Sequence, residues 1–266
     1  MSQPIRRIAI EAADVHVFSD PATASEDAVG RIAATISRGA EMRGKAVLGL
    51  ATGATPLPIY AGLVREHRSG RLSFARVSTY NLDEYHPMGP LDPNSYRSYM
   101  HRHLFGHVDL AADRAHVLDG TVPEAFAAEH AADFDRWIKA EGGLDLQLLG
   151  LGRNGHIGFN EPTDLDVSRA LDLPTRLVEL HPTTIADAAR DFGAADRVPR
   201  RALTMGIAPI LSARTILVVA FGPHKAEAVA QSLRGPITAR VPGSLLRHAS
   251  GKVTWLVDEA SASGIL

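Results

Sequence analysis

Hydrophobic positions along the chain form two alternating patterns. Short runs are continuously apolar and rich in β-branched residues, and longer stretches between them place apolar residues at helical spacing. The short runs predict strands at 5–10, 46–50, 77–81, 116–118, 144–151, 215–220 and 253–257. The longer stretches predict helices at 23–42, 56–69, 95–105, 123–140, 199–211 and 225–233. This alternation is typical of an α/β fold with a mostly parallel sheet and helices on both faces.

The alternation runs through the whole chain without an internal repeat or a clear linker. We therefore expect a single Rossmann-like α/β domain over residues 1–266. One segment, 163–198, has no clear period and scatters Asp, Pro, Thr and Arg residues. Because long irregular connections inside a compact domain are usually functional, we expect this segment to leave the sheet as a lid-like excursion.

The composition mainly excludes some classes of protein and of partner. With 45% hydrophobic and 22% charged residues among 266, the chain is not disordered as a whole. A net charge of −2 gives no basic surplus, so we expect no nucleic-acid partner. The absence of cysteine excludes disulfides and thiolate nucleophiles and fits a cytoplasmic location. The amino-terminal residues lack the apolar stretch of a signal peptide, and apolar runs elsewhere are too short to cross a bilayer, so we expect no membrane partner.

The first candidate for chemistry is the segment Thr-Gly-Ala-Thr-Pro at 52–56, between a predicted strand and a predicted helix. In open parallel sheets, ligands bind at the carboxyl ends of strands. Gly53 permits a tight turn with exposed N–H groups, and the helix that follows favours an anion at its start. No Gly-Lys-Ser/Thr follows, so this is not a Walker A loop. The segment predicts a phosphate site about as strongly as an ordinary capped turn.

The second candidate is an acidic pair, Asp83 and Glu84, at the exposed end of another predicted strand. Adjacent carboxylates are costly to bury without a purpose, and one of them could act as a general base. Taken alone, the pair fits a helix cap or a solvated turn better than a catalytic base.

The third candidate is the glycine-rich stretch 150–162, which follows the most apolar strand. His156 titrates near neutral pH and can move a proton, and Glu161 could orient it as carboxylates orient histidines in hydrolase triads. A histidine inside a glycine frame, with Asn and Glu beside it, is more typical of a catalytic than of a structural role. The zinc-protease spacing His-Glu-x-x-His is absent, and we expect no bound metal.

These three segments, in this order, resemble the glucosamine-6-phosphate deaminase family: TGATP at 52–56, NLDEY at 81–85 and GRNGHIGFNEP at 152–162. The resemblance covers about residues 46–225, and the Asn-Glu-Pro at 160–162 is its most specific element. The related 6-phosphogluconolactonases share the first loop and a Gly-His turn. They generally lack the Asn-Glu-Pro and carry Asp-Glu-Arg where 83–85 stands.

The resemblance implies a role for each matching residue. Asp83 would take the proton from C2 of the open-chain sugar and return it at C1. His156, with Glu161 and Asn154, would open the pyranose ring. The phosphate would be held by Thr52, Gly53, Ala54, Thr55, Lys225 and Arg190. Arg190 matches the arginine of the family only if the alignment is shifted by one residue, and without the shift Ala189 stands at that position. Some family members carry Asp instead of Asn at 154, and the effector pattern of the allosteric bacterial form has no clean counterpart in 163–180.

The implied reaction converts glucosamine-6-phosphate to fructose-6-phosphate and ammonia. The carbonyl of the substrate is its own electron sink, so we expect no cofactor, and the expected partner is a small phosphosugar. A galactosamine-6-phosphate deaminase/isomerase, a 6-phosphogluconolactonase-like hydrolase and a non-catalytic phosphosugar sensor stay as alternatives. The sequence leaves open whether the chain forms a homo-oligomer.

Overall fold

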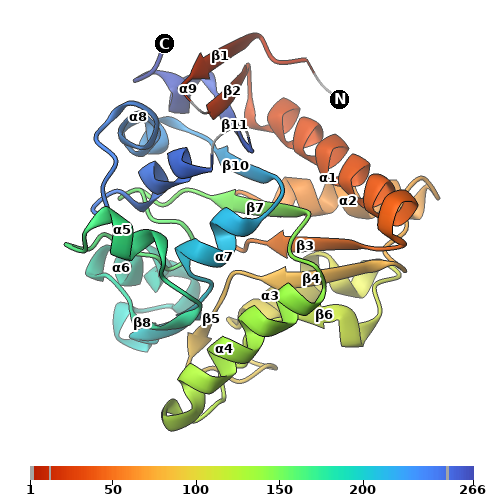
Figure 1. Ribbon diagram of the computed structural model, residues 1–266, viewed down its shortest axis with the longest axis vertical. Coiled ribbons are helices and arrows are strands. Elements are labelled where there is room, and N and C mark those ends of the chain that lie inside the picture. The colour runs from red at the N-terminus through yellow and green to blue at the C-terminus, as the bar shows by residue number, and fades with distance from the viewer. Residues whose placement is uncertain (1–2, 12, 250–251) are drawn as a thin grey trace.

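The architecture is that of a large, mostly parallel sheet flanked by helices (Figure 1). It comes from a computed structural model that describes residues 3–11, 13–249 and 252–266. The sheet has the order β1-β2-β11-β10-β7-β3-β4-β6. Within the described part of this sheet, the β1–β2 pairing is antiparallel and the other pairings are parallel. Its strands are Arg6–Ile10 (β1), Ala13–Phe18 (β2), Ala46–Leu50 (β3), Val77–Asn81 (β4), Ala115–His116 (β6), Leu146–Gly150 (β7), Ile216–Ala220 (β10) and Val253–Asp258 (β11).

The described helices cover this sheet and bury its apolar strands. They are Pro21–Arg43 (α1), Leu57–Arg68 (α2), Tyr96–His103 (α3), Glu124–Ala140 (α4), Val167–Leu171 (α5), Pro182–Phe192 (α6), Ile207–Ser212 (α7), Ala226–Arg234 (α8) and Glu259–Ala262 (α9). The ends of α1 follow local chemistry, since the Asp20 side chain accepts a hydrogen bond from the N–H of Thr23 and Gly44 ends the helix in the left-handed region. No helix in the described residues is long and apolar enough to cross a membrane.

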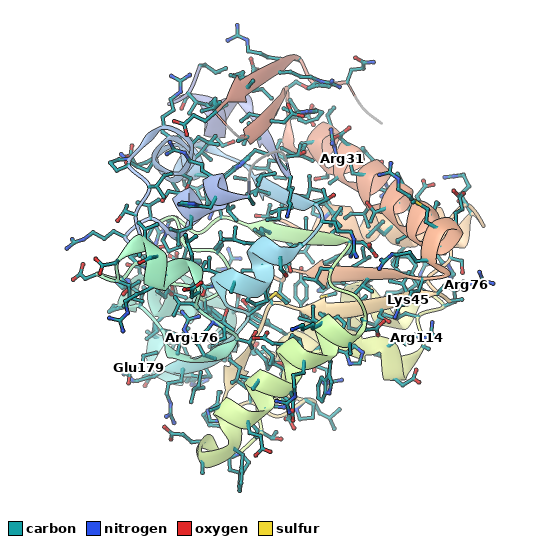
Figure 2. All side chains as sticks on the ribbon, viewed as in Figure 1. Arg31, Lys45, Arg76, Arg114, Arg176 and Glu179 are labelled. Atoms are coloured by element: carbon teal, nitrogen blue, oxygen red, sulfur yellow. The ribbon has the colours of Figure 1, made fainter. Side chains whose placement is uncertain are left out.

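A second, smaller antiparallel sheet lies beside the main one, in the order β5-β9-β8. Its strands are Asp83–His86 (β5), Arg176–Glu179 (β8) and Arg201–Thr204 (β9). In Figure 1 this sheet gathers with α5 and α6 at the lower left, and Arg176 and Glu179 mark β8 in Figure 2. The segment 163–198 therefore leaves the main sheet, and it contains α5, β8 and α6. Its action as a lid stays a prediction.

Several predicted elements need correction. The predicted helix 199–211 is wrong in its first half, where β9 forms the central strand of the small sheet and only α7 is helical. The reason is tertiary, because Ala202 and Leu203 are fully buried between two partner strands and a helix would expose them. Strand β2 was not predicted, because Asp14 and His16 interrupt its apolar pattern. The single domain predicted over 1–266 includes residues 1, 2, 12, 250 and 251, which lie outside the described part.

Candidate active site

A cavity of about 300 Å³ opens at the carboxyl ends of β3, β4 and β7. All three candidate segments line it, as expected for loops that follow neighbouring parallel strands. The predicted site residues in its lining are Thr52, Gly53, Ala54, Thr55, Asp83, His156 and Lys225. Tyr96, Phe159 and His224 also line it and were not predicted as site residues.

The loop 52–55 presents unpaired donors to this cavity. Two tyrosines support the backbone here. The hydroxyl of Tyr60 donates to the carbonyl of Ala51, which precedes the loop, and the hydroxyl of Tyr99 donates to the Gly53 carbonyl at 2.6 Å. Within the described residues, the backbone N–H groups of 52–55 donate no hydrogen bond inside the protein. Backbone N–H groups without a partner just before the start of α2 are suited to bind an anion.

Asp83 is buried, not exposed as its position at a strand end suggested. It is the first residue of β5 and has an exposed fraction of 6%. Its Oδ1 has no hydrogen-bond partner among the described residues. Burial and, to a smaller extent, the neighbouring Glu84 carboxylate together raise the pKa of Asp83 from 3.8 to about 8. An acid held in this way binds a proton readily and is suited to proton transfer.

Glu84 has the alternative role that the sequence allowed, a helix cap. Its carboxylate accepts hydrogen bonds from the backbone N–H groups of Tyr96 at 2.9 Å and Arg97 at 3.0 Å, at the start of α3. It also accepts one from the N–H of Tyr85 at 2.9 Å. Burial raises the pKa of Glu84 to about 7, although these hydrogen bonds and the charge of Arg97 act in the opposite direction.

The glycine-rich segment brings its backbone close to both reactive side chains. A Cβ on Gly152 would lie 2.3 Å from Cε1 of His156, so the imidazole packs directly on a glycine. A Cβ on Gly158, which has φ of 56°, would lie 3.5 Å from Oδ2 of Asp83. The turn thus brings the histidine and the aspartate to one cavity. A side chain at Gly152 would collide with His156, and one at Gly158 would be strained by the positive φ.

Glu161 and Asn154 lie behind His156 rather than in the cavity lining. Nδ1 of His156 lies 3.3 Å from Oε2 of Glu161, and Nδ2 of Asn154 donates to the same oxygen at 3.2 Å. The hydroxyl of Thr184 on α6 donates to Oε1 of Glu161. Burial alone would raise the pKa of Glu161, but His156, Thr184 and Asn154 outweigh it and lower the pKa to about 2. Glu161 is therefore ionised at neutral pH. It lies beside Nδ1 of His156, which makes no hydrogen bond among the described residues.

Thr184 was missed because it lies in the segment 163–198, where no pattern singles it out. It is nevertheless buried, and its hydroxyl links the start of α6 to Glu161 in the glycine-rich segment. A second link runs from β8, where Arg176 donates to Oδ1 of Asn160 at 2.9 Å. The excursion from the sheet is thus fastened directly behind the predicted acid–base group.

The structure does not bring Arg190 into the cavity. Its side chain is 90% exposed and lies 3.7 Å from the Asp191 carboxylate. It lines a neighbouring cavity of about 370 Å³, which shares Gly53, Ala54 and Tyr96 with the first. Lys225 does reach the site, at the start of α8, and burial lowers its pKa. In the described residues, no group of three His, Asp or Glu side chains is placed to hold a metal ion.

The fold and this cavity define the chain as a Rossmann-like α/β enzyme with its site at the strand ends. It belongs to the family of glucosamine-6-phosphate isomerases and 6-phosphogluconolactonases, whose profile matches residues 19–255.

Two curated relatives and one solved structure at 39–48% identity are named glucosamine-6-phosphate deaminases. The glucosamine-6-phosphate deaminase of Rhodopirellula baltica is 46% identical over 255 residues, which cover 96% of each chain. That of Bacillus velezensis is 48% identical over 240 residues, or 90% of this chain and 95% of the relative. A solved monomeric glucosamine-6-phosphate deaminase superposes with a TM-score of 0.86 at 39% identity, covering 94% of this chain and 99% of that one. The 6-phosphogluconolactonase of Trypanosoma brucei, at 18% identity and a TM-score of 0.73, shows the fold alone.

Proposed function

We propose that this chain converts glucosamine-6-phosphate to fructose-6-phosphate and ammonia. The observation that carries the proposal is that Asp83, His156 and the loop 52–55 line one cavity, and that the N–H groups of this loop have no partner among the described residues. The names of the relatives at 46% and 48% identity support the same reaction. The proposal includes a cytoplasmic location, because a phosphorylated sugar is too polar to cross a bilayer unaided.

The first step is ring opening, and it needs one proton removed from the anomeric hydroxyl and one delivered to the ring oxygen. His156 lines the cavity with its ring backed by an ionised Glu161. In this proposal the negative charge of Glu161, 3.3 Å from Nδ1, favours the proton there, and Nε2 accepts or donates on the cavity side. Asn154 keeps Glu161 in place by hydrogen bonding and carries no charge of its own.

The second step is proton transfer from C2 to C1 of the open chain. The free aldehyde makes the C2 proton acidic, and ionised Asp83 takes it and returns it at C1. The product of this transfer is an imine at C2, which water attacks to release ammonia. The phosphate, held by residues 52–55 and Lys225, fixes the reacting carbons over Asp83. Arg190 contributes to the phosphate site in this proposal only if α6 moves it toward the cavity from its exposed position.

Lys225→Ala is expected to raise KM by about 10-fold to 100-fold, the range for a lost charge-assisted hydrogen bond, and to change kcat much less. The phosphate is remote from the reacting carbons, so the lysine binds ground state and transition state alike. Steady-state kinetics of ammonia release measures both constants. Lys139→Ala, on the exposed side of α4, is the matched control and should leave KM unchanged. An unchanged KM in the Lys225 variant excludes this residue from the phosphate site.

The pH dependence follows from the raised pKa of Asp83. Below about pH 8 the empty site holds this carboxyl protonated, and a protonated acid cannot accept the C2 proton. We therefore expect kcat/KM to rise with pH through a limb near 8, whereas an ordinary aspartate would place it near 4. The substrate amine titrates in a similar range, so a ¹³C NMR titration of the Asp83 carboxyl in the empty protein is the control. A profile that is flat from about pH 6 to pH 9 contradicts the assignment.

A direct assay separates this function from its alternatives. The purified protein is offered glucosamine-6-phosphate and, separately, its C4 epimer, and ammonia and fructose-6-phosphate are measured together. Release of ammonia from the first substrate supports the proposal, and faster release from the epimer favours a galactosamine-6-phosphate enzyme. Hydrolysis of 6-phosphogluconolactone without deamination favours a lactonase. Binding without turnover of any of the three favours a sensor. Size-exclusion chromatography of the same sample tests whether a homo-oligomer forms.

A further inference from the structure

Glu84 lies at a junction between the base and the anion loop. Its side chain is almost fully buried, with an exposed fraction of 2%, yet it does not line the cavity. Oε1 accepts from the N–H groups of Tyr85 and Tyr96, and Oε2 accepts from that of Arg97. A buried carboxylate with three backbone donors holds those donors in one geometry.

The helix that Glu84 holds contacts the site twice. Tyr96, the first residue of α3, lines the cavity. One turn later the hydroxyl of Tyr99 donates to the Gly53 carbonyl at 2.6 Å, which supports the anion loop from outside. The start of α3 is therefore the physical connection between the strand that carries Asp83 and the loop that faces the phosphate.

Gly120 packs closely against the Glu84 side chain. A Cβ on Gly120 would lie 3.1 Å from Cγ of Glu84 and 2.4 Å from the Tyr85 carbonyl oxygen.

On β9, the residues paired with Asp83 and Glu84 are Thr204 and Leu203, neither of which is charged. The charged and titratable groups that act on the acidic pair are Arg97 on Glu84, and Tyr60, Tyr85 and Tyr96 around Asp83. Arg97 directs its guanidinium to the Val117 carbonyl at 3.2 Å.

We propose that Glu84 is a positioning residue of this site: it fixes α3 against the anion loop, and its negative charge makes Asp83 a stronger base. The inference rests on the proposed function, in which Asp83 accepts the C2 proton. Three backbone N–H donors and the charge of Arg97 favour the ionised form of Glu84, whereas Oδ1 of Asp83 has no hydrogen-bond partner among the described residues. The Glu84 charge raises the pKa of Asp83, and two adjacent buried carboxylates titrate as a coupled pair.

The test begins with the empty protein, so it does not depend on the substrate. ¹³C NMR with labelled Asp and Glu follows both carboxyl carbons from about pH 4 to pH 10, with Asp83→Asn to assign the aspartate. We expect each resonance to show two steps, one from its own proton and one from that of its neighbour. One independent step for each carboxyl overturns the inference without reference to any variant.

Glu84→Gln removes the charge and keeps the oxygen that accepts from Tyr85 and Tyr96. We expect the Asp83 midpoint to fall by about 1 pH unit, the size of a like-charge effect through a partly screened interior. Ser95→Ala is the matched control, because Ser95 caps the same helix through the N–H of Ser98 but carries no charge. It should weaken α3 and leave the Asp83 midpoint in place. An unchanged midpoint in Glu84→Gln, or an equal fall in Ser95→Ala, overturns the inference.

Kinetics then separates the two parts of the role. In Glu84→Gln the acid limb of kcat/KM should move down with the Asp83 midpoint. Glu84→Asp retains the charge but is too short to reach all three N–H groups, so it should keep the limb and raise KM through a loosened anion loop. An acid limb in Glu84→Asp that falls as far as in Glu84→Gln overturns the charge argument. A parent protein with two-step titrations that releases no ammonia overturns the proposed function, on which the inference rests.

Discussion

Asp83→Asn is expected to lower kcat by about 10²-fold to 10⁴-fold, the range that a positioned general base contributes. Asparagine has the same shape as aspartate but cannot accept the C2 proton. The cavity and the turn at Gly158 should therefore keep their geometry while proton transfer stops. Ammonia release under saturating substrate measures the loss. Asp27→Asn is the matched control, because Asp27 is a buried carboxylate on α1 that pairs with Arg31 outside the cavity. Turnover within a few-fold of the parent for the Asp83 variant contradicts the base assignment.

The same variant should be more stable than the parent at alkaline pH. The unfolded chain releases the Asp83 proton near 3.8, whereas the folded chain retains it to about 8. Between these values the folded state binds more protons, so the contribution of Asp83 to stability falls as pH rises and reaches its lowest level above 8. At about 1.4 kcal/mol for each pKa unit, the cost is at most about 6 kcal/mol. Thermal unfolding at pH 5 and pH 9 should show the variant gaining much more over the parent at pH 9 than at pH 5, because most of the loss accumulates between these values. An equal difference at both values contradicts the raised pKa.

His156→Gln is expected to lower turnover of the ring form of the substrate by about 10²-fold or more, because glutamine cannot move a proton between the anomeric hydroxyl and the ring oxygen. The defect should be confined to ring opening. A 5-deoxy analogue cannot close the six-membered ring, so the variant should process it at a rate much closer to that of the parent. The comparison of two substrates on one variant is its own control for folding. An equal loss with both substrates gives His156 a different role, in the transfer from C2 to C1 or in hydrolysis of the imine.

The main sheet could be read from the sequence to a large extent. Strands β3 and β4 have the predicted bounds, and the long helices α1, α2 and α4 begin and end within two residues of the prediction. Their signals are local, since a run of buried apolar residues or an apolar face at helical spacing lies within a short stretch of chain. The small sheet was not predicted, because each of its strands has four residues and β5 pairs with β9 from a distant part of the chain.

The sequence thus determines the alternation of strands and helices along the chain. It also places the three polar loops at one edge of the sheet, because parallel strands direct their carboxyl ends the same way. Burial is decided by contacts that form only when distant segments pack together. The sequence could not distinguish an exposed Asp83 from one with a pKa of about 8, or a solvated Glu84 from a cap on α3. For the same reason, Thr184 behind Glu161 and Arg190 outside the cavity could be placed only by the tertiary structure.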